Sequence, residues 1–420
     1  MEKILLVTHY TPTKDNYNGP SALMYHLLKN RTPNIELKIL SFNKNRVPQQ
    51  NQKEIANSLN ANLTYIKKNL NNTFLTSNKI THILNKLKIR KLPADCYYSL
   101  SKSDIKSIDS YNPQLVIIYP HTNLQIAKQL SKYRIIVCGP DCVSLHYSRL
   151  LRDLYCFKHR NLKDQIRTYY NRLLIEQEWR KINNAFLYLV GQTDCNYFNI
   201  INNCTKAYFF PHPHYELVNK HISLQHKQIK ILISGKYDLY TYTDITNLVT
   251  TLENSGDEFN IKERYSFTFL GKGWNVLVKR LLQANYNTHY IDWVDDYTNY
   301  ISQFDIQIFP ISVGSGTKGK VLDALSTGIL CIGSKYAFEN IAVQNLHSCI
   351  VYDNVNEIPS ILNNIFNNKY KYETIAHNGK ELVRSKHNPK TIINSLIRFA
   401  TTGEYEYEFN TKDYLKLELK

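Results

Sequence analysis

Short runs of apolar residues that do not alternate with polar ones recur along the whole sequence. Such runs predict strands with both faces buried, which is typical of parallel sheets covered by helices. Segments with helical patterning separate them, for example residues 21–30 and 274–285. We therefore predict an α/β fold of two doubly wound Rossmann-like domains. The predicted strands span residues 3–8, 35–42, 115–120, 134–139, 185–191, 229–235, 265–271, 289–294, 304–311, 328–334 and 349–353.

The domain boundary is predicted from chain length and from two prolines. A chain of 420 residues is too long for one ordinary core and favours two domains of roughly 200 residues. Prolines flank His212 and restrict the chain there, which suits a connector, and a new first strand begins at 229. We predict an N-terminal domain over 1–210, a linker over 211–228 and a second domain over 229–400. The tail, 401–420, gives no signal that places it.

The positive charge of the chain is confined to its first half. Residues 1–210 hold 30 Lys and Arg against 13 Asp and Glu, whereas residues 211–420 hold 22 of each. This asymmetry indicates an anionic partner for the first domain, such as nucleic acid, anionic lipid or an acidic substrate. The eight cysteines show no CxxC and no metal-ligand spacing, so we expect buried, reduced thiols.

Residues 75–106 contain a candidate basic amphipathic helix. Its apolar residues recur at helical spacing and cations surround them. Such a helix either lies on an anionic membrane or packs its apolar stripe on its own domain. No segment is long and apolar enough to span a bilayer, and residues 1–10 resemble a first strand rather than a signal peptide. The stripe consists of Ile80, Ile83, Leu84 and Leu87, with Lys79, Lys86, Lys88, Arg90 and Lys91 around it.

A glycine-rich turn, GSGTKG (314–319), follows the predicted strand 304–311. It matches the GxGxxG pattern of dinucleotide sites and nearly matches the P-loop pattern. The P-loop interpretation fails because Val321 stands where a Mg²⁺-binding hydroxyl is required. The dinucleotide interpretation fails because the turn follows about the fourth strand of its domain instead of the first. Glu339 has the spacing of the ribose-binding acidic residue, but no obvious strand leads to it.

The turn nevertheless suits a phosphate or diphosphate. Glycines let backbone amides approach an anion, and a helix expected to start at Thr317 or Lys318, capped by Thr317, directs its positive end there. Two lysines add positive potential. A carboxylate at Asp323 repels a diphosphate but accepts hydrogen bonds from ribose hydroxyls. The predicted nucleoside diphosphate site comprises Gly314, Ser315, Gly316, Thr317, Lys318, Lys320 and Asp323.

The stretch FPISVGSGTKGKVLDALSTGILCIGS (309–334) resembles the donor-binding strand, turn and helix of retaining nucleotide-sugar glycosyltransferases with the GT-B fold, of the group 1 or family 4 type. Further pieces resemble that family in the same order along nearly the whole chain. The clearest are ISGKYDLY (233–240), at the first turn of the second domain, and GQTDCNYFN (191–199) with FFPHPH (209–214), at the end of the first. GPDCVSLHYSRLLRD (139–153) and LLIEQEWRKI (173–182) also resemble family segments.

The resemblance implies two domains facing across a cleft, a donor such as a UDP- or GDP-sugar, and transfer of a hexosyl or N-acetylhexosaminyl group with retention. No DxD motif occurs, so we expect neither a metal nor another cofactor, and the amides and lysines would stabilise the leaving diphosphate. Two residues depart from the family pattern. Asp323 stands where glutamate is common, and Ser315 stands where many members carry a glutamate that contacts the donor sugar.

Further candidates follow predicted strands, because ligands in open α/β sheets bind beyond the carboxyl ends of strands. His121 and Asp141 are candidate catalytic residues, although either could simply cap the next helix. Gly235 and Lys236 are expected to contact donor phosphate. His9 and Tyr10 follow the first strand. Gly19, Pro20 and Ser21 then open a helix whose amides could face the acceptor or a phosphate.

The leading hypothesis is a bacterial sugar transferase of surface polysaccharide, capsule or lipooligosaccharide synthesis, which is cytoplasmic and peripheral at the anionic inner face of the plasma membrane. Its partners would be a nucleotide sugar and a glycan or lipid-linked acceptor, and no nucleic acid is expected. A nucleotide-sugar 2-epimerase of the same fold is an alternative, as is a homologue without catalysis. A basic nucleic-acid-binding protein is favoured by charge alone and lacks a binding motif.

Overall fold

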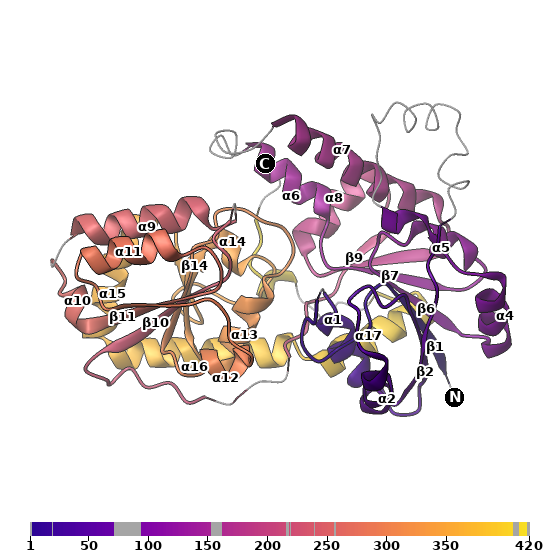
Figure 1. Cartoon of the computed structure of the whole chain (residues 1–420), viewed down its shortest axis with the longest axis horizontal. Helices are drawn as coiled ribbons and strands as arrows, with labels where there is room; N and C mark the ends of the chain where they lie inside the picture. The colour runs from indigo at the N-terminus through magenta and orange to yellow at the C-terminus, as the bar shows by residue number, and fades with distance from the viewer. Residues whose placement is uncertain are drawn as a thin grey trace. The chain divides into compact units, whose positions relative to one another are not determined.

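The computed structural model describes residues 2–18, 20–70, 94–152, 162–215, 218, 220–238, 240–255, 258–405 and 411–417. By its internal contacts the chain divides into two compact units (Figure 1). The first comprises Met1–Ser148, Asn161–Pro213 and Pro389–Glu408, and the second Arg149–Arg160, His214–Asn388 and Phe409–Lys420. Within the described ranges, no helix is both long and apolar enough to cross a membrane.

The first unit is built on a parallel sheet with the strand order β3-β2-β1-β6-β7-β8-β9. The order reverses between β1 and β6, which are hydrogen-bonded neighbours although more than a hundred residues separate them. The strands are β1 (Lys3–Thr8), β2 (Glu36–Ser41), β3 (Ala61–Tyr65), β6 (Leu115–Tyr119), β7 (Ile135–Gly139), β8 (Ala185–Leu189) and β9 (Ala207–Phe209). A short antiparallel pair joins β4 (Asn69–Leu70) to β5 (Tyr98–Ser99).

Helices alternate with these strands, as a doubly wound sheet requires. They are α1 (Ala22–Lys29), α2 (Gln49–Ser58), α4 (Lys102–Tyr111), α5 (Leu124–Gln129), α6 (Val143–Arg152), α7 (Leu162–Glu178), α8 (Gln192–Asn202) and, from the end of the chain, α17 (Pro389–Thr402). Helix α6 begins in the first unit, and its residues from Arg149 onward are assigned to the second.

The second unit has a parallel sheet with the order β12-β11-β10-β13-β14-β15, which reverses between β10 and β13. Its strands are β10 (Ile229–Ser234), β11 (Tyr265–Leu270), β12 (Thr288–Ile291), β13 (Ile306–Phe309), β14 (Leu330–Ser334) and β15 (Ile350–Tyr352). Its helices are α9 (Tyr242–Ser255), α10 (Ile261–Arg264), α11 (Asn275–Gln283), α12 (Tyr297–Ile301), α13 (Gly319–Thr327), α14 (Lys335–Phe338), α15 (Ile358–Asn367) and α16 (Lys369–Lys386).

The core of the second unit lies on both faces of its sheet. Ile231 and Ile233 of β10 join one hydrophobic cluster, whereas Leu232 between them joins another. This placement explains the unbroken apolar run, since successive side chains of a strand point to opposite faces. The prediction of two doubly wound α/β domains is therefore confirmed, and a strand lies within or across each predicted range.

Sequence patterning missed the two edge strands of the first sheet, as well as the two-residue strands β4 and β5 of the separate antiparallel pair. Edge strand β3 buries only Leu63 of its five residues, so its sequence carries no apolar run. At the opposite edge, β9 is three residues long. Edge strands are often short and weakly buried, which limits pairing with other chains. Such strands lack the run of apolar residues from which strands were predicted here.

The predicted domain boundaries need one correction. After β9, the chain passes from the first unit to the second between Pro213 and His214, which lies inside the predicted linker. Helix α17, however, belongs to the first unit, whereas the prediction placed it in a second domain that ends at 400. Figure 1 shows α17, in yellow, among the elements of the first unit. Phe399 packs against the rings of Phe186, Tyr208 and Phe210. Aromatic contacts between distant segments therefore place this helix, and no local pattern reports them.

Part of the tail is ordered against the second unit. The amide of Asn340 donates to the carbonyl of Leu415 at 2.8 Å, and the amide of Leu415 donates to the carbonyl of Ile341 at 3.0 Å. Lys386 pairs with Asp413 at 2.7 Å. The cysteines within the described residues carry free thiols, and all of them except Cys204 are buried.

Candidate functional site

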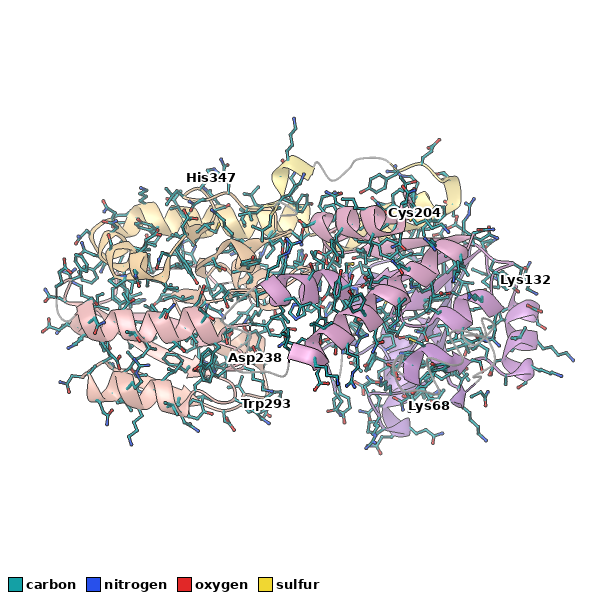
Figure 2. The ribbon with its side chains drawn as sticks, turned by 90° about the horizontal axis from the view of Figure 1, so that it is seen from above. Lys68, Lys132, Cys204, Asp238, Trp293 and His347 are labelled. Carbon is teal, nitrogen blue, oxygen red and sulfur yellow. The ribbon has the colours of Figure 1, made fainter. Side chains whose placement is uncertain are left out.

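The topological reversal of the second sheet brings the predicted donor-binding residues together. Gly235 directly follows β10, and the glycine turn follows β13, its hydrogen-bonded neighbour. The carboxyl ends of both strands meet at one edge, where ligands bind in sheets of this type. Lys236 lies at the same edge and is exposed. Asp238 follows the last residue of β10, Ser234, and Trp293 follows the last residue of β12, Ile291, each by a few residues (Figure 2).

Two glycines allow the backbone to close tightly at this edge. Gly235 and Gly271 have φ angles of +130° and +116°, a region that L side chains rarely adopt. A Cβ on Gly271 would lie 1.9 Å from the carbonyl oxygen of Gly235. That oxygen accepts a hydrogen bond from Nε1 of buried Trp274 at 3.0 Å. The end of β10 is therefore fixed by backbone contact and by an indole from α11's N-terminus.

Lys320 places a partly desolvated cation beside Gly235. Its Nζ donates to the carbonyl of Ser234 at 2.9 Å, and a Cβ on Gly235 would approach this Nζ to 2.7 Å. Burial lowers the pKa of Lys320 to about 8, although the carboxylate of Asp238 acts in the opposite direction. A bound anion would restore the pKa, so the position is electrostatically suited to a phosphate group.

The helix after the turn starts later than predicted. It begins at Gly319, and its N-cap is Lys318, whose side chain does not cap it. The prediction that Thr317 caps the helix is therefore wrong. Instead, Nζ of Lys318 donates to the carbonyls of Ser315 and Gly316, both at 3.0 Å. No N-cap side chain satisfies the first-turn amides of α13, which is the arrangement that binds anions.

Asp323 lies one turn into α13, half-buried among hydroxyl groups. Burial, followed by the nearby Asp323 carboxylate, raises the pKa of Tyr297 to about 12. The same two causes raise the pKa of Tyr215. Tyr297 also shares a hydrogen bond of 3.0 Å with Ser234 Oγ, which accepts from Gln307 at 2.6 Å. Asp323 thus lies near a group of polar side chains, the polar wall, formed by Tyr297, Ser234 and Gln307. Sequence patterning did not predict this group because its members come from separate elements.

Glu339 is not available to a dinucleotide ribose. It is fully buried, and its two carboxylate oxygens accept from the two terminal nitrogens of Arg149 at 2.7 Å each. Arg149 is only 11 % exposed and is assigned to the second unit. This pairing removes the acidic residue on which the dinucleotide alternative depended.

In the first unit, the candidate catalytic residues meet at the carboxyl edge of the sheet. His121 follows β6, and Asp141 follows the neighbouring β7. The His121 carbonyl accepts from Nε1 of buried Trp179 at 2.9 Å. Burial, with a smaller effect from Arg172, lowers the pKa of His121 to about 4, so its ring is neutral at pH 7. Within the described residues its Nδ1 has no hydrogen-bond partner.

His9 occupies the same edge, at the end of β1. Its pKa is also lowered to about 4 by burial, against the effect of Asp95 at 3.7 Å from Nδ1. Neither ring nitrogen forms a hydrogen bond within the described part of the chain. Tyr10 is the next residue, and Lys44 Nζ lies 5.7 Å from the centre of its ring. The reversal of strand order between β1 and β6 therefore gathers neutral histidines at this edge.

At the starts of α6 and α1, backbone amides already donate hydrogen bonds to side chains of the protein. Asp141 is not the N-cap of α6, which begins at Val143. The amide of Cys142 donates to Asp194 at 2.8 Å, and the amide of Ser144 donates to Glu176 at 3.0 Å. Both carboxylates are buried. Sequence analysis missed them because they reach α6 from α7 and α8.

The amides at the start of α1 are likewise engaged. Those of Ser21 and Ala22 donate to Oδ1 of Asn16 at 3.1 and 3.0 Å. Ser21 is buried and Pro20 is exposed. Gly19 lies outside the described residues, as does the segment 71–93 that contains the predicted amphipathic stripe. A role for residues 19–21 in acceptor binding stays a prediction.

Comparison with protein families decides the class of this site. Residues 228–368, which contain β10 to β15 and the glycine turn, match the family model described as Glycosyl transferases group 1. The match covers the sheet and the glycine turn of the second unit and does not extend to the first. The enzyme is accordingly classified as a glycosyltransferase, and the resemblance read from residues 309–334 is confirmed. No curated protein matches the chain by sequence.

Solved structures show that the whole glycosyltransferase has the GT-B fold. Sucrose-phosphate synthase from Thermosynechococcus elongatus aligns with a TM-score of 0.63 at 11% identity, covering 95% of this chain and 98% of that one. HepE from Anabaena, in complex with UDP, aligns with a TM-score of 0.61 at 10% identity over 96% and 100%. The lipopolysaccharide outer core galactosyltransferase WaaB, without ligand, gives 0.57 at 12% identity over 94% and 99%.

Within the described residues, no group of three or more His, Cys, Asp or Glu side chains is placed to hold a metal ion. The cationic and dipolar groups described above are Lys320, the glycine turn and the start of α13. The site can therefore bind an anion through lysine and backbone amides.

Proposed function

We propose that this glycosyltransferase moves a sugar from a nucleoside diphosphate sugar to a hydroxyl group of a glycan or lipid-linked acceptor. The observation that carries the proposal is Lys320, whose ammonium lies beside Gly235 and next to the uncapped start of α13. Such an arrangement favours a diphosphate. The HepE structure that shares this fold contains UDP, which makes a uridine donor the first to test.

The donor would lie along the carboxyl edge of the second sheet. The amides of residues 314–319, with Lys320 and exposed Lys236, would hold the diphosphate. Asp323 would accept hydrogen bonds from the ribose hydroxyls, beside the polar wall formed by Tyr297 and Ser234. Ser315 would stand at the sugar end. Its hydroxyl would reach less far than the glutamate of the family pattern, so it would define the sugar specificity differently.

The proposed reaction retains the anomeric configuration and uses no metal. The bond between the anomeric carbon and the diphosphate oxygen breaks, and the acceptor oxygen bonds to that carbon on the same face. The acceptor proton passes to the departing diphosphate oxygen. Amides and Lys320 stabilise the negative charge that develops on the diphosphate, which is the main catalytic contribution expected of such a site.

The acceptor would bind to the first unit, whose sequence carries the excess positive charge. His121 and Asp141, on neighbouring strands β6 and β7, are the proposed catalytic residues on that side. A neutral His121 can accept a hydrogen bond from an acceptor hydroxyl. The basic charge supports an acceptor that bears phosphate or sits on an anionic membrane. WaaB, which has the same fold, is named for lipopolysaccharide outer core synthesis, and this supports a role in bacterial surface polysaccharides.

Thermal denaturation with UDP, GDP, ADP and CMP tests the donor class. A ligand at 100 times its Kd should stabilise the folded protein by about 2.7 kcal/mol. We expect one nucleoside diphosphate to raise Tm in the presence of EDTA and to lose this effect in Lys320→Met. The protein with Lys279→Met, the same change of residue at an exposed position of α11, is the control. Stabilisation that requires Mg²⁺, or equal stabilisation of wild type and Lys320→Met, would contradict the proposal.

A further inference from the structure

The carbonyl groups of the glycine turn are held by side chains from outside and inside the turn. The carbonyl of Gly316 accepts from Nδ2 of Asn340 at 3.2 Å as well as from Lys318. The carbonyl of Gly314 accepts from Nη1 of Arg149 at 2.6 Å. Arg149 is in turn fixed by buried Glu339. Three consecutive carbonyls, of residues 314, 315 and 316, therefore have side-chain donors.

These contacts decide where the amides of the turn point. In a trans peptide, the carbonyl of one residue and the amide of the next point in opposite directions. One ammonium, that of Lys318, reaches the carbonyls of both Ser315 and Gly316, so these two carbonyls point to the same side. The amides of Gly316 and Thr317 consequently point to the other side. Gly316 has a φ angle of +63°, which glycine adopts without strain.

Asn340 is itself held rigidly. It is fully buried and has a φ angle of +65°, a conformation that asparagine tolerates better than most residues. Its amide donates to the carbonyl of Leu415, and the amide of Leu415 donates to the carbonyl of Ile341. The returning tail of the chain thus fixes the backbone of the residue whose side chain reaches Gly316.

We propose that Asn340 and Lys318 are positioning residues that hold the carbonyl side of the glycine turn, so that its amides face the donor diphosphate. The inference rests on the proposed nucleoside diphosphate donor. It gives Lys318 a different task from Lys320. Lys320 supplies the cation beside Gly235, whereas Lys318 acts through the backbone of the turn. Turn and helix are then preorganised before the donor arrives, which reduces the cost of binding.

The test compares the affinities of Asn340→Gly for UDP and for UMP by calorimetry, and repeats this with GDP and GMP and with ADP and AMP. Glycine keeps the left-handed backbone and removes the amide donor. The ratio of the monophosphate Kd to the diphosphate Kd isolates the second phosphate and does not depend on the folded fraction. We expect the ratio to fall about tenfold, equivalent to about 1.4 kcal/mol. Lys318→Met should lower it similarly, and Lys318→Arg, which keeps donors, should largely restore it.

Asn285→Gly is the matched control. Asn285 is exposed, follows α11 and has a φ angle of +62°, so this variant makes the same change of residue in the same backbone region. Its ratio should equal that of wild type. A wild-type ratio in folded Asn340→Gly would overturn the positioning role while leaving the proposed donor intact. If wild type binds none of the three diphosphates more tightly than the monophosphates, both the donor proposal and this inference are overturned.

Discussion

At the scale of single residues, Lys320 connects the fold to an expected pH dependence. Its Nζ contacts the carbonyl of Ser234 at the end of β10, and its pKa is lowered to about 8. The main cause is burial, which disfavours the charged form. A diphosphate bound beside it would favour the charged form and raise the pKa again. Binding and protonation of Lys320 are therefore linked.

The sign of this linkage gives the first residue-scale prediction. Affinity for UDP should be full below the pKa of the free protein, about 8, and should fall as pH rises through it, by up to about tenfold per pH unit until the pKa of the complex is reached. The terminal phosphate of UDP ionises near pH 6, so titrations between pH 7 and 9.5 are not complicated by it. Calorimetry measures the effect.

Two substitutions provide the controls for this pH profile. Lys320→Arg keeps a charge that does not titrate in this range, so its affinity should be nearly independent of pH. Lys320→Met should bind weakly at every pH. An unchanged downward slope in Lys320→Arg would show that another group is responsible.

A second residue-scale prediction concerns a pair of glycines. Gly271→Ala should destabilise the protein by at least about 3 kcal/mol, because the new Cβ would meet the carbonyl of Gly235 at 1.9 Å and the φ angle is +116°. Gly319→Ala should be neutral or stabilising by up to about 1 kcal/mol, because a Cβ there meets nothing within 4 Å. Chemical denaturation of both variants checks this. Equal losses would show that the strain at Gly271 is relieved elsewhere.

Local sequence identified the glycine turn, Lys320 and Asp323, since all lie within ten residues of one another after an apolar strand. It did not identify Asn340, Trp274 or Tyr297, which reach the same edge from other segments. Asparagine, tryptophan and tyrosine are common at buried or half-buried positions, so these residue types alone do not indicate a binding site. Only the order of the strands in the sheet, β12-β11-β10-β13-β14, which brings the segments after these strands to one edge, reveals what these residues contact.

At the scale of secondary-structure elements, burial on both faces made the central strands predictable. The run KILLVT became β1 and IKILIS became β10, because both faces of these strands are buried beyond the lysine near the start of each. Edge strand β3 buries one of five residues and carried no such signal. The start of α13 was predicted two residues or one residue too early because the cap is a lysine without a capping hydrogen bond, which no capping rule anticipates.

Helix α17 provides the prediction at this scale. Phe399 is buried and packs against Phe186, Tyr208 and Phe210, so Phe399→Ala should cost about 3–5 kcal/mol. Thermal unfolding with and without UDP measures the loss. Ligand stabilisation of the variant should persist, since the donor site lies in the other unit. Tyr370→Ala, which changes an exposed ring on α16, serves as the control and should leave Tm nearly unchanged.

At the scale of the whole molecule, the alternation of strands and helices along the sequence was sufficient to predict two doubly wound α/β domains, and the observed strand orders agree with it. The assignment of segments to units was less predictable. The last helix belongs to the first unit and residues 411–417 contact the second. Long-range aromatic and backbone contacts determine both placements, and these contacts leave no periodic pattern in the sequence.

Truncation is the prediction that belongs to this scale. A chain that ends after residue 408 keeps α17 but loses Leu415, which hydrogen-bonds to Asn340 and Ile341, and Asp413, which pairs with Lys386. We expect the shortened protein to remain folded, with a lower Tm and a weaker affinity for UDP. A chain that carries Leu415→Ala should bind UDP like wild type, because the backbone hydrogen bonds remain, although loss of its packing against the core of the second unit should lower Tm slightly. Wild-type affinity in the shortened chain would show that the tail is dispensable for the donor site.

The late return of α17 also determines how this enzyme can be divided. A fragment ending at residue 213 would leave Phe186, Tyr208 and Phe210 without the partner that covers them, so it should be prone to aggregation when expressed alone. A synthetic peptide of residues 389–408 supplies that partner. The amino-terminal half is therefore best produced by complementation, as a split protein in two pieces.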